Sequence, residues 1–250
     1  MIETSELQAW ADRLGVATAQ IRHDHLVSHL LATIPLLSAR DVTFYGGTAL
    51  CRTILDGARV SEDIDLLHAD PEQLLEDLAN TIPRALRREF PRAAFEPTTR
   101  THDTWTTNLV APEALRVRVQ VTRSVSADPW QFADAETSLR YSDLDETVRL
   151  SVPTPDTFVA MKGVAWHDRH APRDLYDLAG LARGGHIRPA AAELMRAKAS
   201  HGWITTEFER LPRSVLRDWD AQLAHQVRTL PDPADLAREV LSAIAASEHR

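Results

Sequence analysis

The chain has 250 residues, of which 44% are hydrophobic and 26% are charged, and its net charge is −8. These values are ordinary for a globular protein, and the negative charge argues against a protein that coats nucleic acid through a global basic field. Neither a long apolar run nor a charged-then-apolar leader opens the sequence, so we expect a cytoplasmic protein without a membrane partner.

Two helices are predicted at the start of the chain, over residues 3–15 and 16–38. The second has apolar residues at helical spacing, which indicates that the pair covers a sheet. His23 and His25 flank Asp24 in this second helix. Alternate positions of a helix do not face one another, so this His-Asp-His run alone does not predict a metal site.

A short strand followed by a glycine turn is predicted next. Val42 to Tyr45 favour a strand, and Gly46-Gly47 let the backbone turn sharply and approach a ligand that any Cβ would block. The arrangement favours phosphate, because Thr48 and the amides that open the next helix can donate to anionic oxygens. Cys51, the single cysteine, lies in that helix and is expected to be a buried structural thiol.

Two aspartates mark a second strand. Asp63 and Asp65 flank Ile64, so the two-residue repeat of a strand sends both carboxylates to one face. Two such carboxylates indicate a divalent-metal site. Ser61 would share that face if the strand begins early, where it could contact phosphate or be modified, and its alternative role is that of a loop cap.

An arginine-rich helix end follows. Pro71 begins a predicted helix that extends to about Glu89, with Pro83 marking a kink or break inside it. Four arginines crowd this segment: Arg84, Arg87, Arg88 and Arg92. They form either a basic binding surface within an acidic protein or a solvated helix face, and the sequence weighs the two equally.

Three strands are then expected, over residues 93–95, 105–110 and 115–122. The last places Arg116, Arg118 and Gln120 on one face. The mixed, polar stretch 124–151 suggests a further strand or hairpin and the junction between two lobes.

The remaining sequence predicts helices. A start signal at Pro153-Thr154-Pro155-Asp156 precedes a helix over residues 157–167, and Pro172 starts another in which Asp174 and Asp177 share a face. Further helices are expected over residues 188–200, 212–229 and 233–248.

Two ordered motifs carry a resemblance to a known family. The first is GGTAL from Gly46, then Arg59, then SEDIDL from Ser61; the second is KGVAWHDRHAPRDLYDL from Lys162. Together they resemble the DNA polymerase β-like nucleotidyltransferases and, within these, the AbiEii/MenT toxin branch, over roughly residues 22–180. The resemblance implies an α+β fold, with a mixed β-sheet flanked by helices over residues 1–150 and a helical C-terminal lobe over residues 151–250 that completes the active-site cleft.

The resemblance also implies roles for individual residues. Asp63 and Asp65 would hold Mg²⁺, and Lys162 would meet the charge that builds on the triphosphate as pyrophosphate leaves. The phosphate-binding residues would be Gly46, Gly47, Thr48 and Ser61, with Lys162. Arg169 and Arg173 either contact phosphate or RNA or pair with nearby aspartates.

One position departs from the wider pattern. Polymerase β-like enzymes commonly place a third metal-binding carboxylate on a strand like 115–122, and the comparable residue here is the neutral Gln120. Either Asp174 supplies the missing carboxylate as a catalytic residue, or the nucleotide phosphates and water hold the metal. The competing role for Asp174 is an ion pair to Lys162 or Arg173.

The implied function is Mg²⁺-dependent transfer of nucleotides from an NTP to RNA, with tRNA 3′ ends as the acceptor, by a toxin that blocks translation and has a cognate antitoxin. The arginine cluster mildly favours RNA. One alternative keeps the chemistry but uses a protein or small-molecule hydroxyl as acceptor. Another, motivated by Gln120, is a non-catalytic nucleotide-binding module.

Overall fold

The structure, a computed structural model, describes residues 2–248. The chain forms two compact units. The sheet unit comprises Met1–Ala127 and Ala133–Val152, and the helical unit comprises Asp128–Phe132 and Pro153–Arg250. The segment Asp128–Phe132 therefore belongs to the helical unit, although in sequence it lies between the two segments of the sheet unit.

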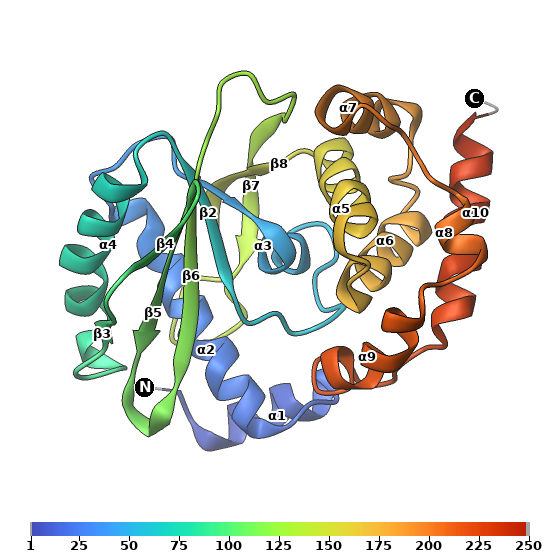
Figure 1. Cartoon of the computed structure of the whole chain (residues 1–250). Coiled ribbons are helices and arrows are strands. Elements are labelled where there is room, and N and C mark those ends of the chain that lie inside the picture. Colours follow the sequence, from blue (N-terminus) through green and yellow to red (C-terminus); the bar gives the residue numbers. More distant parts are fainter. Residues whose placement is uncertain (1, 249–250) are drawn as a thin grey trace. The chain divides into compact units, whose positions relative to one another are not determined.

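The sheet unit contains four α-helices and an eight-stranded sheet within the described residues (Figure 1). Its elements in chain order are α1 (Thr4–Leu14), α2 (Thr18–Thr33), η1 (Ile34–Leu36), β1 (Thr43–Tyr45), α3 (Gly46–Arg52), β2 (Ile64–His68), α4 (Pro71–Ala85), η2 (Leu86–Arg88), β3 (Ala94–Phe95), β4 (Thr99–Thr101), β5 (Thr104–Val110), η3 (Pro112–Ala114), β6 (Arg116–Arg123), β7 (Phe132–Ser138) and β8 (Thr147–Pro153).

The sheet is mixed, with strand order β3-β5-β6-β2-β1-β8-β7 and β4 paired to β5. Strand β2 runs antiparallel to β1 and parallel to β6, and β1 runs parallel to β8. The register aligns Tyr45 with Asp65, and Asp65 with Gln120. Helices flank this mixed sheet, which confirms the α+β prediction.

One face of the central strands forms the core of the sheet unit. Ile64 and Leu66 of β2 and the valines of β6 are fully buried, and the residues between them are more exposed. Helices α2 and α4 pack against β6, and α4 also contacts β2 and β5. The alternation of a strand therefore leaves the other face of β2 and β6 for polar side chains.

A buried ion cluster joins α2, α3 and the segment after β7. Asp24 is fully buried and accepts hydrogen bonds from Arg52 (2.9 Å), Arg140 (3.3 Å) and the Tyr141 hydroxyl (2.7 Å). Burial alone would raise the pKa of Asp24, but the two guanidinium groups and the hydroxyl lower it overall. The carboxylate of Asp24 is therefore held by arginine and tyrosine side chains. Cys51, beside this cluster, is 1% exposed, which confirms the expected buried thiol.

The helical unit consists of α5 (Pro155–Arg169), α6 (Pro172–Arg183), α7 (Pro189–Ala199), α8 (Thr206–Glu209), α9 (Arg213–Leu223) and α10 (Pro233–Glu248). Helix α5 packs against α6 and α7, and α6 packs against α9 and α10. Gly163 allows the close approach of α5 and α7, because a Cβ there would lie 2.7 Å from the end of Met195. No helix among residues 2–248 is both long enough and apolar enough to span a bilayer.

Some elements differ from the sequence expectations. The predicted helix 16–38 stops at Thr33 and continues as a 3₁₀ turn, because Pro35 cannot donate the next backbone hydrogen bond. Strand β4 and the short α8 were not predicted, and β4 consists of three exposed polar residues without an apolar alternation. Helix α9 ends at Leu223, so the predicted helix over residues 212–229 was too long.

Candidate active site

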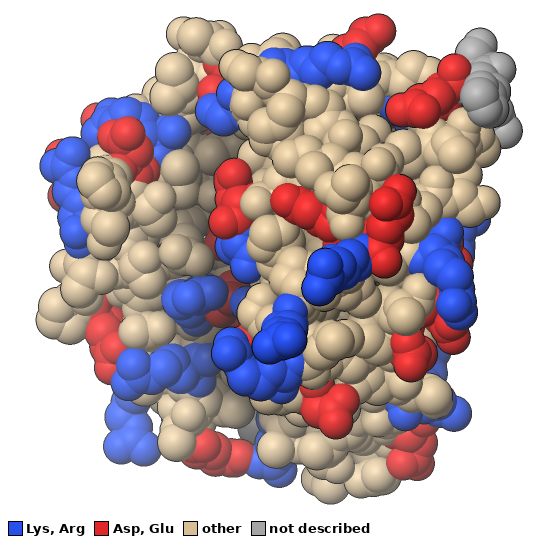
Figure 2. Space-filling view, turned by 45° about the vertical axis from the view of Figure 1, so that its right-hand side comes forward, with Lys and Arg blue, Asp and Glu red and all other residues tan. Residues whose placement is uncertain are grey.

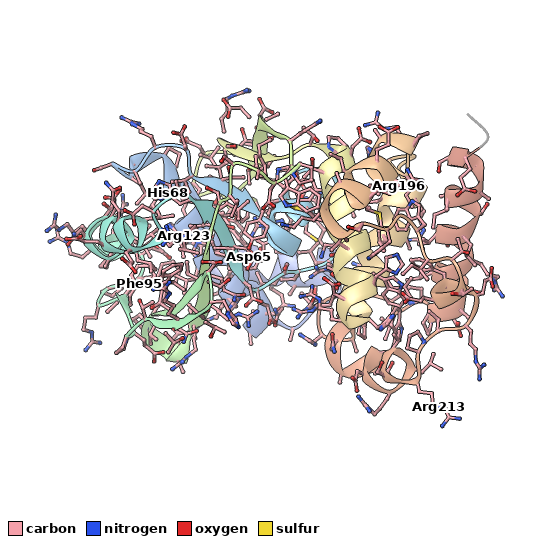
Figure 3. All side chains as sticks on the ribbon, turned by 45° about the horizontal axis from the view of Figure 1, so that its top comes forward. Asp65, His68, Phe95, Arg123, Arg196 and Arg213 are labelled. Carbon is pink, nitrogen blue, oxygen red and sulfur yellow. The ribbon has the colours of Figure 1, made fainter. Side chains whose placement is uncertain are left out.

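The polar face of the sheet carries the two predicted metal ligands. Asp63 directly precedes β2 and Asp65 lies within it, and the fully buried Ile64 between them places both carboxylates on the face away from the core. The Asp63 side chain is 23% exposed. Figure 3 labels Asp65 on β2, with His68 further along that strand and Arg123 opposite His68 on β6.

The glycine turn is fitted closely around neighbouring side chains. Gly46 has a φ of +80°, and a Cβ on it would lie 2.1 Å from Oδ2 of Asp65. A Cβ on Gly47 would lie 2.6 Å from a terminal nitrogen of Arg59 and 3.3 Å from Oγ of Ser61. The two glycines thus allow the backbone after β1 to approach the side chains of the motif that surrounds β2.

Thr48 ties the glycine turn to the residues before β2. Its hydroxyl donates to the backbone carbonyl of Asp63 and lies 3.0 Å from Oγ of Ser61. Thr48 is 1% exposed and Ser61 is 8% exposed. Both hydroxyls are therefore part of an internal network that fixes the backbone at Asp63.

The neighbours of the two aspartates on β6 are a cation and an amide. Arg118 forms a two-point ion pair with Asp63, in which Nε donates to Oδ1 at 3.1 Å and Nη2 donates to Oδ2. Gln120 stands opposite Asp65, and its amide nitrogen lies 3.4 Å from Oγ1 of Thr106. The position beside Asp65 on β6 therefore carries no negative charge.

Tyr45 lies on the same face, and its pKa is affected by the charge of Asp65. It is paired with Asp65 across the β1–β2 ladder, and its hydroxyl donates to Thr122 at 3.0 Å. Burial and, next, the charge of Asp65 raise the pKa of Tyr45 to about 12. The phenol therefore stays protonated at neutral pH and remains a hydrogen-bond donor.

In the helical unit, Lys162 lies between two buried aspartates. Its Nζ is 3.1 Å from Oδ1 of Asp174 and 2.7 Å from Oδ2 of Asp177, and both aspartates are fully buried. Arg169 donates to both oxygens of Asp174, at 2.8 and 3.1 Å. Burial raises the pKa of Asp174, but Lys162 and Arg169 outweigh it and lower the pKa overall.

These contacts distinguish between the roles considered for Asp174. Both of its oxygens accept hydrogen bonds from cationic side chains, and Arg169 remains 60% exposed while it pairs. The observed geometry is that of an ion pair that orients Lys162 and Arg169. A catalytic role for Asp174 in place of the acid missing at Gln120 stays a prediction.

The four clustered arginines lie at the end of α4 and in the turn after it, and all are exposed: Arg84, Arg87, Arg88 and Arg92. None of the carboxylates in residues 2–248 forms an ion pair with any of these arginines. Figure 2 shows Lys and Arg side chains interspersed with Asp and Glu on the face in view.

Sequence reasoning missed two contributors to the polar face and one separate cluster. It placed Arg118 on the correct face but did not pair it with Asp63, and it gave Tyr45 no role. The separate cluster is His25, His29 and Asp143, the one described group of three potential metal ligands whose donor atoms lie within 4.8 Å of one another. The four-residue spacing of the histidines was a visible signal, whereas Asp143 is too distant in sequence to be found by spacing.

The comparisons with known proteins decide the family. A model of the AbiEii nucleotidyl transferase toxins of type IV toxin–antitoxin systems matches residues 29–243. The chain belongs to the AbiEii family. As an AbiEii protein, it is a nucleotidyltransferase toxin of a type IV toxin–antitoxin system, with nucleotide substrates and an antitoxin partner.

One solved structure shares the fold of this AbiEii protein. MenT4, a nucleotidyltransferase toxin from Mycobacterium tuberculosis H37Rv, is 18% identical with a TM-score of 0.67, over 94% of this chain and 85% of that chain. An antigenic nucleotidyltransferase-like protein from Paracoccidioides brasiliensis is 16% identical with a TM-score of 0.43, over 92% of this chain and 98% of that chain. A comparison with curated protein sequences found no match.

Proposed function

We propose that this AbiEii protein is a Mg²⁺-dependent enzyme that transfers nucleotides from an NTP to RNA, at tRNA 3′ ends, and thereby blocks translation. The observation that carries the proposal is the pair Asp63 and Asp65 on one face of the sheet, with the backbone of Gly46 in direct contact with the Asp65 carboxylate. Both proposed substrates occur in the cytoplasm, where the protein would act.

The two aspartates fit Mg²⁺ by their chemistry. Mg²⁺ prefers oxygen ligands and is commonly held by one or two carboxylates together with substrate phosphates and water. Asp63 and Asp65 supply such oxygens, and the neutral Gln120 leaves the remaining positions to the nucleotide and water. When bound, the ion would neutralise charge on the triphosphate and on the departing pyrophosphate.

The protein's own groups would position the nucleotide. Arg118 holds Asp63 in place, and once a cation takes that carboxylate, its guanidinium becomes a donor for phosphate. Gly46, Gly47, Thr48 and Ser61 would line the phosphate site, where the two glycines give access to the backbone and the two hydroxyls keep it fixed. We assign Lys162 to the triphosphate on the strength of its motif, with Asp174 and Asp177 orienting its ammonium group.

Incubation with labelled NTPs, Mg²⁺ and total RNA tests the proposal. Label should enter RNA, and purified tRNA should replace total RNA as acceptor. Asp65→Asn should lower the rate by at least about a hundredfold, because the electrostatic stabilisation of the transferring group is lost. Asp103→Asn, which changes a 67% exposed carboxylate in the same unit, should retain full activity.

Other outcomes of this experiment would point elsewhere. Label in protein or in a small molecule would indicate a different hydroxyl acceptor, and NTP binding without any transfer would indicate a binding module. Full activity of a folded Asp65→Asn variant would remove the metal assignment.

We also propose that RNA contacts the arginine cluster at the end of α4, because its four exposed side chains have no described carboxylate partner. Arg87→Glu with Arg88→Glu should weaken RNA binding and reduce the salt dependence by about one unit of slope for each lost phosphate contact. Arg213→Glu on α9, also exposed, is the matched control (Figure 3). An unchanged slope in the double variant would assign the cluster to solvent.

A further inference from the structure

A second group of potential ligands lies in the sheet unit, apart from the two aspartates of the polar face. His25 and His29 are one turn apart on α2, and Asp143 comes from the loop between β7 and β8. Their side chains are 4%, 13% and 14% exposed. The cluster is therefore nearly enclosed, with a small opening to solvent.

Three donor atoms converge in this cluster. Nε2 of His25 lies 3.1 Å from Oδ1 of Asp143 and 3.0 Å from Nε2 of His29. Nε2 of His29 lies 3.1 Å from Oδ2 of Asp143. All three pairs of side chains are thus in contact through atoms that can bind either a proton or a metal.

With Asp143 ionised, protons alone cannot satisfy all three contacts. If both imidazoles carry a proton on Nε2 to reach Asp143, two N–H groups also face one another at 3.0 Å. If one Nε2 lacks its proton, that nitrogen presents a lone pair to the carboxylate. A divalent cation at the centre removes the conflict, because each of the three atoms then directs a lone pair at the ion.

The distances and the surroundings suit a small transition-metal ion. Bonds of about 2.0–2.1 Å in a tetrahedral site place ligand atoms roughly 3.3 Å apart, so the observed spacing needs to open by only a few tenths of an ångström. Aromatic rings pack against the two imidazoles. The ring centroid of Phe90 lies 5.4 Å from that of His25 and 5.3 Å from that of His29, and the centroid of Tyr141 lies 4.8 Å from that of His25.

We propose that His25, His29 and Asp143 bind one Zn²⁺-type ion, with water at the open fourth position, and that this ion fastens the β7–β8 loop to α2. The donor set separates this site from the proposed Mg²⁺ site, because two imidazoles and a carboxylate select borderline metals whereas carboxylates alone select Mg²⁺. The same loop carries Arg140 and Tyr141, which hold Asp24, so the ion would stabilise a loop that is already anchored to α2.

Metal titration of the chelator-treated protein tests the proposal. Co²⁺ should bind as one ion with the visible absorption of a tetrahedral complex, Zn²⁺ should displace it, and Zn²⁺ should raise the melting temperature. His29→Gln and Asp143→Asn should each lose at least about tenfold in affinity. His102→Asn, an exposed histidine between β4 and β5, and Asp65→Asn should both bind as the unmodified protein does.

Contrary results are equally clear. Equal Zn²⁺ binding by His29→Gln and Asp143→Asn would overturn the site, and so would a Co²⁺ spectrum identical to that of the free aqueous ion. The second measurement needs only the unmodified protein, so it decides the matter even if the variants fail to fold. A loss of stability in the variants without any metal effect would leave a hydrogen-bonded cluster.

Discussion

Two aspartate–arginine pairs in the sheet unit have the same chemistry and opposite surroundings. Asp24 is fully buried, and its partners Arg52 and Arg140 have side chains that are 1% and 2% exposed. Asp63 is 23% exposed and its partner Arg118 is 46% exposed. Water reaches the second pair and not the first.

This difference in exposure separates a structural ion pair from an exchangeable one. A charge that is buried with its partners cannot leave them without a large desolvation cost, so Asp24 and its arginines act as a fixed joint. A partly exposed pair is worth little to stability, which leaves Asp63 able to exchange Arg118 for a cation. Exposure, more than residue type, thus marks which carboxylates are available for chemistry.

The largest expected effect is on stability, from a change at the buried Asp24. Asp24→Asn should lower the free energy of unfolding by about 3–5 kcal/mol, because it leaves the buried guanidinium of Arg52 without a counter-charge and leaves Arg140 with only the half-exposed Asp56. Urea denaturation measures this change. Asp56→Asn is the control, because Asp56 contacts Arg140 from a 49% exposed position and should cost no more than about 1 kcal/mol. Equal losses in the two variants would remove the distinction that we draw from exposure.

Two glycine variants, at Gly46 and Gly57, test the candidate active site around Asp65. Gly46→Ala should cost about 1–3 kcal/mol and abolish activity, because the new Cβ would displace the Asp65 carboxylate. Gly57→Ala is matched to it, since Gly57 has a φ of +77° but no heavy atom within 4 Å of an added Cβ. Thermal unfolding and nucleotide transfer should show a similar backbone cost in both variants and loss of activity only at Gly46. Retained activity in Gly46→Ala would mean that the close contact with Asp65 is not needed.

Acid should act in part through the buried carboxylate of Asp24. The pKa of Asp24 is lowered from 3.8 on folding, so its contribution to stability is present above that value and is lost as the pH falls through the lower folded pKa. The free energy of unfolding, measured by urea titration below about pH 4, should therefore fall less steeply in Asp24→Asn than in the unmodified protein. Asp103→Asn should follow the unmodified curve, and parallel curves for all three proteins would contradict the assignment.

The smallest expected effect is at Gln120, the neutral residue opposite Asp65 in the candidate active site. Gln120→Glu places a second charge beside Asp65, which should reduce the Mg²⁺ concentration needed for half-maximal transfer by severalfold, about 1 kcal/mol or less. Gln73→Glu adds the same charge on the exposed side of α4 and should leave the Mg²⁺ requirement unchanged. No difference between the two variants would mean that Gln120 does not face the metal site.

Local spacing was enough to predict the parts of the site that lie on single elements. The alternation at Asp63, Ile64 and Asp65 predicted a shared carboxylate face, and helical spacing predicted that Asp174 and Asp177 share a face. The fold class followed from the motifs and is confirmed by the mixed sheet and the family match.

Contacts between distant segments could not be predicted in this way. The pairing of Arg118 with Asp63 depends on the parallel register of β2 and β6, which residue spacing along one strand does not specify. The joining of Asp24 to Arg140 depends on a loop more than a hundred residues later in the chain. Strand β4 gave no signal because its three residues are all polar and exposed.

The topology of the sheet unit also constrains the order in which it can fold. Strand β1 pairs on one side with β2, but on the other side it pairs with β8 through Thr43 and Ser151. During synthesis, the strand that leads into the glycine turn therefore stays half-paired until residues near 151 have left the ribosome. Because such non-local pairing slows folding, the sheet unit should acquire its final structure late, and a fragment that stops at Ala127 should fail to fold.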